Sequence, residues 1–355
     1  MLVRSAFLGF LTATVVMSTR FLWSKFPEVP WSFPFLVLIP GVVGAFLIYW
    51  YYLRTGIDPK ETRYNGLGEF LVHIHDPREP ELEKWGVRGL ISWLLSLFGG
   101  CAGAEGAAME LSHQAAVSSR TSSSRWFEQQ RRSDVSVCMA SGLTAAFGAP
   151  LAGLVLPVEL RTGGRTLNVV IAVLAATTGM WCMEWIFEVA PIQFLDLFAI
   201  LDWKSLLVPK FFLLFVLMTI VGSFLAMLIT AFFSYSRESF FELFDTRLKY
   251  LMPAGALIML LLIMIYDRSH QPIPLLFGNL FESNLSYGEV FLTGLSRFLL
   301  FSLVFSIFGT AGMFWPVFFL GAILGYAFGF GLEEAQIFFV ICGGAIVLGA
   351  VSGAP

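Results

Sequence analysis

Residues 138–150 read CMASGLTAAFGAP and residues 342–355 read CGGAIVLGAVSGAP, and this internal match decides the fold of the chain. A second match lies upstream of each stretch, with AGAEG at residues 102–106 and AGMFWP at residues 311–316. The offset is 209 residues from Gly103 to its counterpart in the second match and 205 residues between the two Gly-Ala-Pro endings. Two matches at nearly equal offset predict an internal repeat.

The composition places this repeat in a membrane. Of the 355 residues, 57% are apolar and 13% are charged, whereas a soluble domain carries about 25% charged residues. With 37 Phe, 10 Trp and a mean hydropathy of +0.77, the chain has more apolar side chain than one core can bury. The excess must face lipid, which excludes an ordinary soluble enzyme. A net charge of −3 gives no basic surface, so no nucleic-acid partner is expected.

About ten apolar segments are separated by short polar loops. Several are shorter than the ~20 residues that cross a ~30 Å hydrocarbon core, and many contain glycine. Such broken segments persist in a bilayer only where their backbone is buried in protein or lines a wet cavity. We therefore predict an all-α polytopic membrane fold with broken helices and an internal inverted repeat. The apolar segments are 5–23, 34–53, 86–103, 135–158, 167–189, 206–233, 250–266, 288–310, 314–330 and 336–352.

The first repeat is expected over residues 1–190 and the second over 191–355, with no soluble regulatory domain. The longest polar interruption, 113–134, is interpreted as a loop or a helix end. A second polar run contains His73 and His75, a spacing that suits a metal ion. Since no third and fourth ligand cluster nearby, we interpret this run as a solvated connector and expect no metal or other cofactor.

The segments after the two breaks predict helix N-termini. Residues 106–111 read GAAMEL and residues 314–319 read FWPVFF, with Pro316 near a first-turn position where its missing N–H is tolerated. Helix N-termini present unpaired amides and the positive end of the helix dipole. In a duplicated membrane unit these ends meet near the repeat interface, and they attract anions.

Four charged residues inside or close to the apolar segments require an interpretation. Glu105 lies between two glycines in an otherwise uncharged run, so it is a candidate gate or proton acceptor. The alternatives for Glu105 are an interfacial position or a pairing with an arginine. Arg297 is expected to pair with an acid on a neighbouring helix. Glu110 and Glu159 are either parts of a proton path or helix-end groups at water.

Three motifs, taken together, resemble those of a known family. The sequence GAEGA at 103–107, GLTAAFGAPLAGLVLPVEL at 142–160 and GMFWP at 312–316 are similar to three signature regions of the CLC chloride channels and proton-coupled antiporters. In that family the regions read G[RK]EGP, AAAFxAPLAGxLFxxEE and GxFxP. The order and spacing agree as well, so the resemblance covers the chain from about residue 1 to residue 355.

The resemblance implies roles for particular residues. Glu105 would be the gating glutamate that competes with anions, and the amides of Met313 and Phe314, with Gly106, would belong to the anion site. In the stretch RYNGLGEF, Asn65 stands where the family has the serine of GSGIP, and an amide side chain donates hydrogen bonds as a hydroxyl does. The implied ligands are small anions, chloride first, with protons. The implied protein is a homodimer in the plasma (inner) membrane.

The chain also departs from the family pattern. Ala104 and Ala107 replace the basic residue and the proline of the first motif. Leu160 stands at the inner glutamate of the antiporters, beside Glu159. The sequence stops at Pro355, so we expect the closing helices, including the one whose tyrosine caps the anion site, to be missing and the dimer to be weakened.

Three functional hypotheses remain open from the sequence. The leading one is anion transport, either as a passive channel or as an anion/proton antiporter. The second is a non-transporting, degenerate CLC-like subunit. The third is an intramembrane enzyme, which is disfavoured because Gly-x-Ser-x-Gly, His-Glu-x-x-His and paired intramembrane aspartates are all missing from the sequence.

Overall fold

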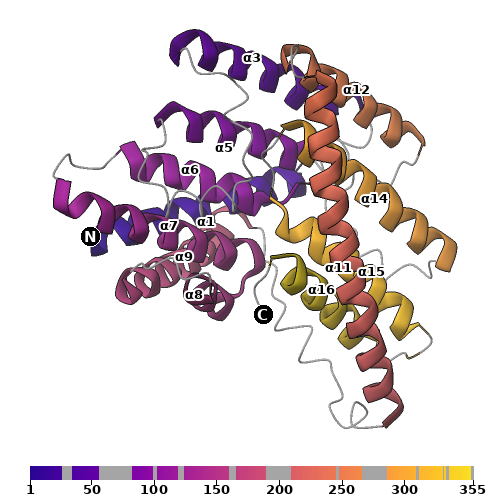
Figure 1. The fold of residues 1–355 in the computed structure, drawn as a ribbon. Coiled ribbons are helices and arrows are strands. Elements are labelled where there is room, and N and C mark those ends of the chain that lie inside the picture. The colour runs from indigo at the N-terminus through magenta and orange to yellow at the C-terminus, as the bar shows by residue number, and fades with distance from the viewer. Residues whose placement is uncertain are drawn as a thin grey trace.

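The computed structural model shows an all-helical chain over the residues that it describes (Figure 1). These residues are 1–25, 34–55, 82–98, 102–118, 124–159, 165–188, 209–244, 248–265, 286–308, 312–330, 332 and 336–352. The helices are α1 (Leu2–Lys25), η1 (Pro34–Val37), α3 (Leu38–Thr55), α5 (Leu82–Leu97), α6 (Ala104–Ser118), α7 (Ser124–Phe147), α8 (Pro150–Glu159), α9 (Thr166–Phe187), α11 (Pro209–Phe244), α12 (Leu248–Ile265), α14 (Tyr287–Phe308), α15 (Phe314–Gly329) and α16 (Gln336–Ser352).

The helices differ in whether they are long enough to cross a bilayer. Among the described residues, four segments have the length and hydropathy for a full crossing: Leu2–Lys25, Thr166–Phe187, Phe211–Ser236 and Tyr287–Ile307. Helices α6, α8 and α15 have 15, 10 and 16 residues. At 1.5 Å per residue the longest of these three spans about 24 Å, less than the ~30 Å hydrocarbon core. The shorter helices agree with the broken segments predicted from sequence.

The helices of the two halves gather on two sides of the molecule. In Figure 1, α1 and α5 to α9 form one group, while α11, α14, α15 and α16 form the other. Helix α1 packs on α9, α5 on α6, and α15 on α16. Helix α3 lies against α12 and so joins the two groups. The order helix, break, helix, helix occurs twice, as α5–α6–α7 and as α14–α15–α16.

Close packing between helices depends on small residues. A Cβ atom at Gly321 would overlap the carbonyl oxygen of Gly343, and a Cβ at Gly325 would overlap the carbonyl oxygen of Phe339. Helices α15 and α16 therefore approach with their backbones in contact. Such close approach is how membrane helices gain dispersion contacts when lipid removes the hydrophobic driving force between them.

Two predicted segments can be compared with the structure. The segment 135–158, predicted to be among those that glycine breaks, is divided into α7 and α8 at Gly148, which has a left-handed φ of 62°. The polar stretch 113–134 was expected to be a loop or a helix end. Within it, α6 ends at Ser118 and α7 begins at Ser124. The repeat boundary at 190/191, His73 and His75 lie outside the described residues.

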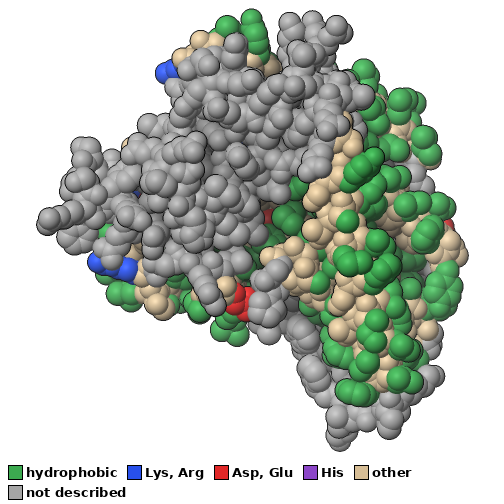
Figure 2. Space-filling model, in the orientation of Figure 1, with side chains coloured by type: hydrophobic (Ala, Val, Ile, Leu, Met, Phe, Trp, Pro, Cys, Tyr) green, Lys and Arg blue, Asp and Glu red, His purple; other side chains and the backbone are tan. Residues whose placement is uncertain are grey.

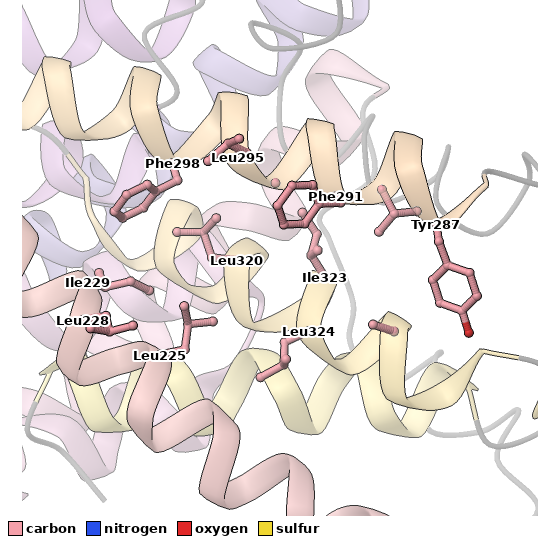
Figure 3. A pocket seen from close by; sticks show the side chains of 13 residues that line it. Leu225, Leu228, Ile229, Tyr287, Phe291, Leu295, Phe298, Leu320, Ile323 and Leu324 are labelled. Atoms are coloured by element: carbon pink, nitrogen blue, oxygen red, sulfur yellow. The ribbon is translucent and has the colours of Figure 1, made fainter.

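The outer surface of the second group is apolar. Phe212, Ile220 and Phe224 on α11 are all exposed, and hydrophobic side chains cover the right side of Figure 2, where α11 and α14 lie. A groove of about 600 Å³ lies between α11, α14 and α15 (Figure 3). Apolar side chains such as those of Leu225 and Phe291 line it. This surface suits contact with lipid tails.

The turn at Gly148 gives a stability prediction. An alanine there would keep a left-handed backbone, which costs L-residues about 1–2 kcal/mol. We expect Gly148→Ala to lower the unfolding temperature of the detergent-solubilised protein. Gly288→Ala is the matched control, since Gly288 lies in the first turn of α14 with no atom near the added Cβ, and it should leave that temperature unchanged or raise it. Equal unfolding temperatures for Gly148→Ala and the wild type would contradict this account.

Candidate functional site

The candidate site begins with the first turn of α6. Glu105 is the second residue of this helix, and its side chain is only 1% exposed. The first four amides of a helix have no partner within the helix, and the dipole adds positive potential at the same end. A carboxylate placed there is stabilised by its own helix. The local sequence thus explains how an acid is accommodated among apolar segments.

A second helix N-terminus approaches from the other half of the chain. Helix α15 begins at Phe314, preceded by Met313 as its N-cap, and the Met313 side chain makes no capping hydrogen bond. Pro316 occupies the first turn, where it has no N–H to leave unsatisfied. Because the N-cap supplies no side-chain oxygen, the amides at this end remain available to an external acceptor.

A backbone hydrogen bond holds the two N-termini together. The Gly103 amide donates to the Gly312 carbonyl at 2.9 Å, as an isolated antiparallel bridge between the two segments that precede α6 and α15. A Cβ atom at Gly312 would overlap the Gly103 carbonyl oxygen and would lie 2.7 Å from Cδ and Oε1 of Glu105. Glycine is therefore required at Gly312 for the close approach, and residues 209 positions apart become neighbours.

The Glu105 carboxylate crosses this junction and rests on the other helix. The Trp315 amide donates to Oε1 of Glu105 at 3.3 Å. The amides of Phe314 and of Glu105 itself also interact favourably with the carboxylate. Oε2 is buried and has no hydrogen-bond partner among the described residues. The carboxylate thus lies at the N-terminus of α15, and helix N-termini are places where proteins bind anions.

Aromatic side chains fix the start of α15. The rings of Phe147 and Trp315 are stacked with centroids 4.6 Å apart, and the ring of Phe314 meets Phe147 edge-on at 6.5 Å. Phe147 is the last residue of α7, so these contacts tie the two halves a second time. The sequence did not predict that the Trp315 amide binds the carboxylate or that Phe147 packs on Trp315. The first of these contacts could have been predicted, because Trp315 supplies the second amide of the helix expected to start at Phe314.

A buried arginine caps the C-terminal end of α7. Arg20 on α1 is 7% exposed, and its guanidinium donates to the carbonyl oxygen of Ala146 at 2.7 Å and to that of Ala145 at 3.5 Å. A cation at this end satisfies carbonyls that have no partner within the helix and complements the dipole. The interaction holds the end of α7 that carries Phe147.

The structure gathers four of the predicted site residues. Glu105 and Gly106 lie in the first turn of α6, and Met313 and Phe314 lie at the start of α15. Asn65 is outside the described residues.

The other two predicted acids lie elsewhere. Glu110, five residues after Glu105 on α6, is 1% exposed, and its Oε1 is 3.5 Å from Nε of Arg88. Glu159 is half-buried at the end of α8. Arg297, which was expected to pair with an acid, has its guanidinium carbon 5.8 Å from the centre of the Phe319 ring. Within the described residues, no group of three His, Cys, Asp or Glu side chains forms a metal site.

The fold is that of a multi-pass membrane protein. The junction of two helix N-termini inside it presents amides and positive dipole ends, which suit an anion. Residues 44–355 match the model of the voltage-gated chloride channel family, and the chain belongs to this family, known as CLC. It is therefore an anion-transport protein and not an enzyme, as the sequence predicted. None of the curated proteins compared with the chain matches it significantly.

Solved structures share the fold. A CLC-type fluoride/proton antiporter is 20% identical, with a TM-score of 0.75 over 99% of this chain and 86% of its own. A slow cyanobacterial Cl⁻/H⁺ antiporter is 16% identical, with a TM-score of 0.66 over 99% and 94% of the two chains. A eukaryotic CLC transporter is 19% identical, with a TM-score of 0.68 over 99% and 65%. These likenesses confirm the predicted all-helical membrane fold.

The glycine junction gives a structural prediction. In Gly312→Ala the new methyl group would occupy the space of the Glu105 carboxylate. We expect a density map of the variant to show the carboxylate displaced from the Trp315 amide, and the protein to unfold at a lower temperature. Gly288→Ala again serves as the control with open space around the methyl group. A carboxylate still bound to the Trp315 amide in Gly312→Ala would refute the assigned geometry.

Proposed function

We propose that this protein transports a small anion, chloride first, through a pore gated by Glu105, as a channel or as an anion/proton antiporter. The observation that carries the proposal is the Glu105 carboxylate on the Trp315 amide at the N-terminus of α15. A carboxylate and a halide are both monovalent anions that accept hydrogen bonds from amides. One therefore excludes the other from this position.

The gating step follows from charge. When ionised, Glu105 is held by the dipoles of α6 and α15 and blocks the anion position. When protonated, it loses its charge and most of its attraction to the amides, and an incoming anion takes its place. Anion flux is therefore expected to rise as pH falls, because protons remove the competitor.

The anion is proposed to bind the amides of Gly106, Met313 and Phe314, with the side chain of Asn65 as a further donor. The placement of Gly106, Met313 and Phe314 at two converging helix starts supports this assignment. Two structurally similar proteins are described as a fluoride/proton antiporter and a Cl⁻/H⁺ antiporter, which supports a small anion as the cargo. Protons are the proposed second substrate.

Glu110 and Glu159 are the proposed stations of a proton path. Glu110 is buried on the same helix as Glu105, and Glu159 ends α8 beside the position of Leu160. Leu160 itself lies outside the described residues. An ionisable group inside the membrane is costly and marks a functional position by default.

The proposed assembly is a homodimer in the plasma (inner) membrane. Exposed apolar side chains on α8 and α9, among them Leu151, Val158 and Trp185, support a protein contact there. Native mass spectrometry of the purified protein measures the mass of the complex and so gives the number of subunits.

The central prediction concerns Glu105→Gln. The amide side chain mimics the protonated acid, so liposomes with this variant should release chloride at a rate that does not change with pH and without proton movement. Glu289→Gln is the control: this acid is exposed at the start of α14, and the wild-type pH response should persist. If Glu105→Gln keeps the wild-type pH response, Glu105 is not the gate. If purified wild type releases no chloride and no fluoride at any pH, the chain is a non-transporting relative.

The anion position gives an independent prediction. We expect crystals grown in bromide at low pH to show anomalous density within hydrogen-bond distance of the Phe314 amide, because protonation vacates that position. Glu105→Gln crystals should show the same peak at neutral pH. Bromide found only on surface loops in both crystals would contradict the site assignment.

A further inference from the structure

Arg20 on α1 is a buried cation that forms no ion pair among the described residues. It is 7% exposed, and its guanidinium contacts the carbonyl oxygens of Ala145 and Ala146 and the sulfur of Met17. No acid on the described parts of the helices packed against α1 lies within ion-pair distance of it. A buried charge is costly unless another charge compensates it, so Arg20 requires a negative counterpart.

Helix α1 runs antiparallel to α6, which carries Glu105. Arg4, near the start of α1, donates to the carbonyl of Ala116 near the end of α6. Further along α1, the hydroxyl oxygen of Thr12 lies 2.8 Å from that of Ser112 on α6. The two helices are in contact, and both pack against α7 (Figure 1). Later residues of α1 therefore lie beside earlier residues of α6.

Arg20 lies at the same depth in the fold as Glu105. From the contact between the two hydroxyl groups, Arg20 is eight residues further along α1 and Glu105 is seven residues back along α6. At about 1.5 Å of rise per residue, these steps are about 12 Å and about 10 Å. Because the axes of packed helices are about 8–10 Å apart, the guanidinium is on the order of 10 Å from the start of α6.

The carbonyls that Arg20 binds form the negative end of a helix beside the candidate anion position. Helix α7 ends at Phe147, and its last four carbonyls have no partner within the helix. The Phe147 ring stacks on that of Trp315, whose amide binds the Glu105 carboxylate. This end of a helix dipole is equivalent to about half a negative charge, which repels an anion. Without compensation, the end of α7 would oppose the two helix N-termini.

We propose that Arg20 sets the affinity of the site for small monovalent anions, because its charge outweighs the negative end of α7. The inference rests on the anion site proposed above. Arg20 is a positioning residue, which acts through the end of α7 and does not touch the anion. The guanidinium carries a full positive charge against about half a negative charge at the helix end, so the sum favours an anion. The Glu105 carboxylate is the negative counterpart when it occupies the position, and the transported anion replaces it one for one.

Chloride binding by the full chain tests the inference. Isothermal titration calorimetry is carried out on the detergent-solubilised Glu105→Gln protein, in which no carboxylate competes for the position. Adding Arg20→Gln should raise the chloride dissociation constant about tenfold, which is the effect of a unit charge on the order of 10 Å away at an effective dielectric constant of about 20.

The choice of substitution separates the charge of Arg20 from its hydrogen bonds. Glutamine keeps an N–H donor for the Ala146 carbonyl, so Arg20→Gln removes the charge without removing the donor. Arg20→Lys keeps the charge, and its chloride dissociation constant should stay within about threefold of that of the Glu105→Gln protein.

Arg4→Gln is the matched control. Arg4 also donates to a carbonyl near a helix end, but it lies at the opposite end of α1 from Arg20. Its partner Ala116 is eleven residues, or about 16 Å, along α6 from Glu105. This change should leave the chloride dissociation constant of the Glu105→Gln protein unchanged.

Ser24→Glu provides a second test that leaves Arg20 and its contacts with α7 in place. Ser24 is exposed one helical turn beyond Arg20, where an added acid pairs with the guanidinium at i,i+4 spacing. Water screens a charge at an exposed position, so we expect the chloride dissociation constant to rise only about threefold. Ser24→Gln adds no charge and should have no effect.

Two results would overturn the inference. One is an Arg20→Gln protein that binds chloride as tightly as the Glu105→Gln background, and the other is an equal loss of affinity in Arg20→Gln and Arg20→Lys, which would indicate capping alone. If Arg20→Gln does not fold, a Ser24→Glu protein with the affinity of Ser24→Gln overturns it.

The same titrations distinguish this inference from the proposed function. If the Glu105→Gln protein itself binds no chloride, the proposed anion site fails and the inference fails with it. Chloride binding in that protein, with no effect of Arg20→Gln or Ser24→Glu, contradicts only the role of Arg20.

Discussion

The hydrogen bond from the Gly103 amide to the Gly312 carbonyl is the constraint on which the site depends. It joins two segments that would otherwise leave backbone groups unsatisfied inside a membrane, where each such group costs several kcal/mol. By pairing with each other, the two breaks satisfy part of this requirement and bring the starts of α6 and α15 to one place. The same closeness is what excludes any side chain larger than hydrogen at Gly312.

A junction of two helix starts has a chemical consequence. Two sets of free amides and two positive dipole ends point at one location, and an acceptor is needed to satisfy them. Glu105 supplies that acceptor from within the chain, through its contact with the Trp315 amide. The arrangement explains how a carboxylate is tolerated at 1% exposure without an arginine beside it in the first turn.

The two halves of the chain share the order of their helices, but the side chains near the break differ in charge. The first half places acids at Glu105 and Glu110, whereas the helix that follows the break in the second half is uncharged from end to end. The second half has aromatic side chains near the corresponding positions. Trp315 stacks on Phe147, and Phe319 lies beside Arg297. Both of these buried acids therefore lie on one side of the junction, and the side chains on the other side are apolar.

Local sequence determined the membrane fold, the breaks and the helix starts, because hydropathy, glycine and the uncharged surroundings of Glu105 act over a few residues. Together with the family resemblance, it predicted Glu105, Gly106, Met313 and Phe314 as site residues, and the structure brings these four together at the starts of α6 and α15. It marked the segment that contains Gly148 as broken, but it did not give the left-handed φ at that residue, since φ leaves no trace in hydropathy. Nor did it give the Trp315 amide as the partner of Glu105, or Phe319 as the neighbour of Arg297, because those contacts join residues that only tertiary packing makes adjacent. The sequence by itself determined which groups are chemically capable of holding or replacing an anion, while tertiary structure decided which of them meet.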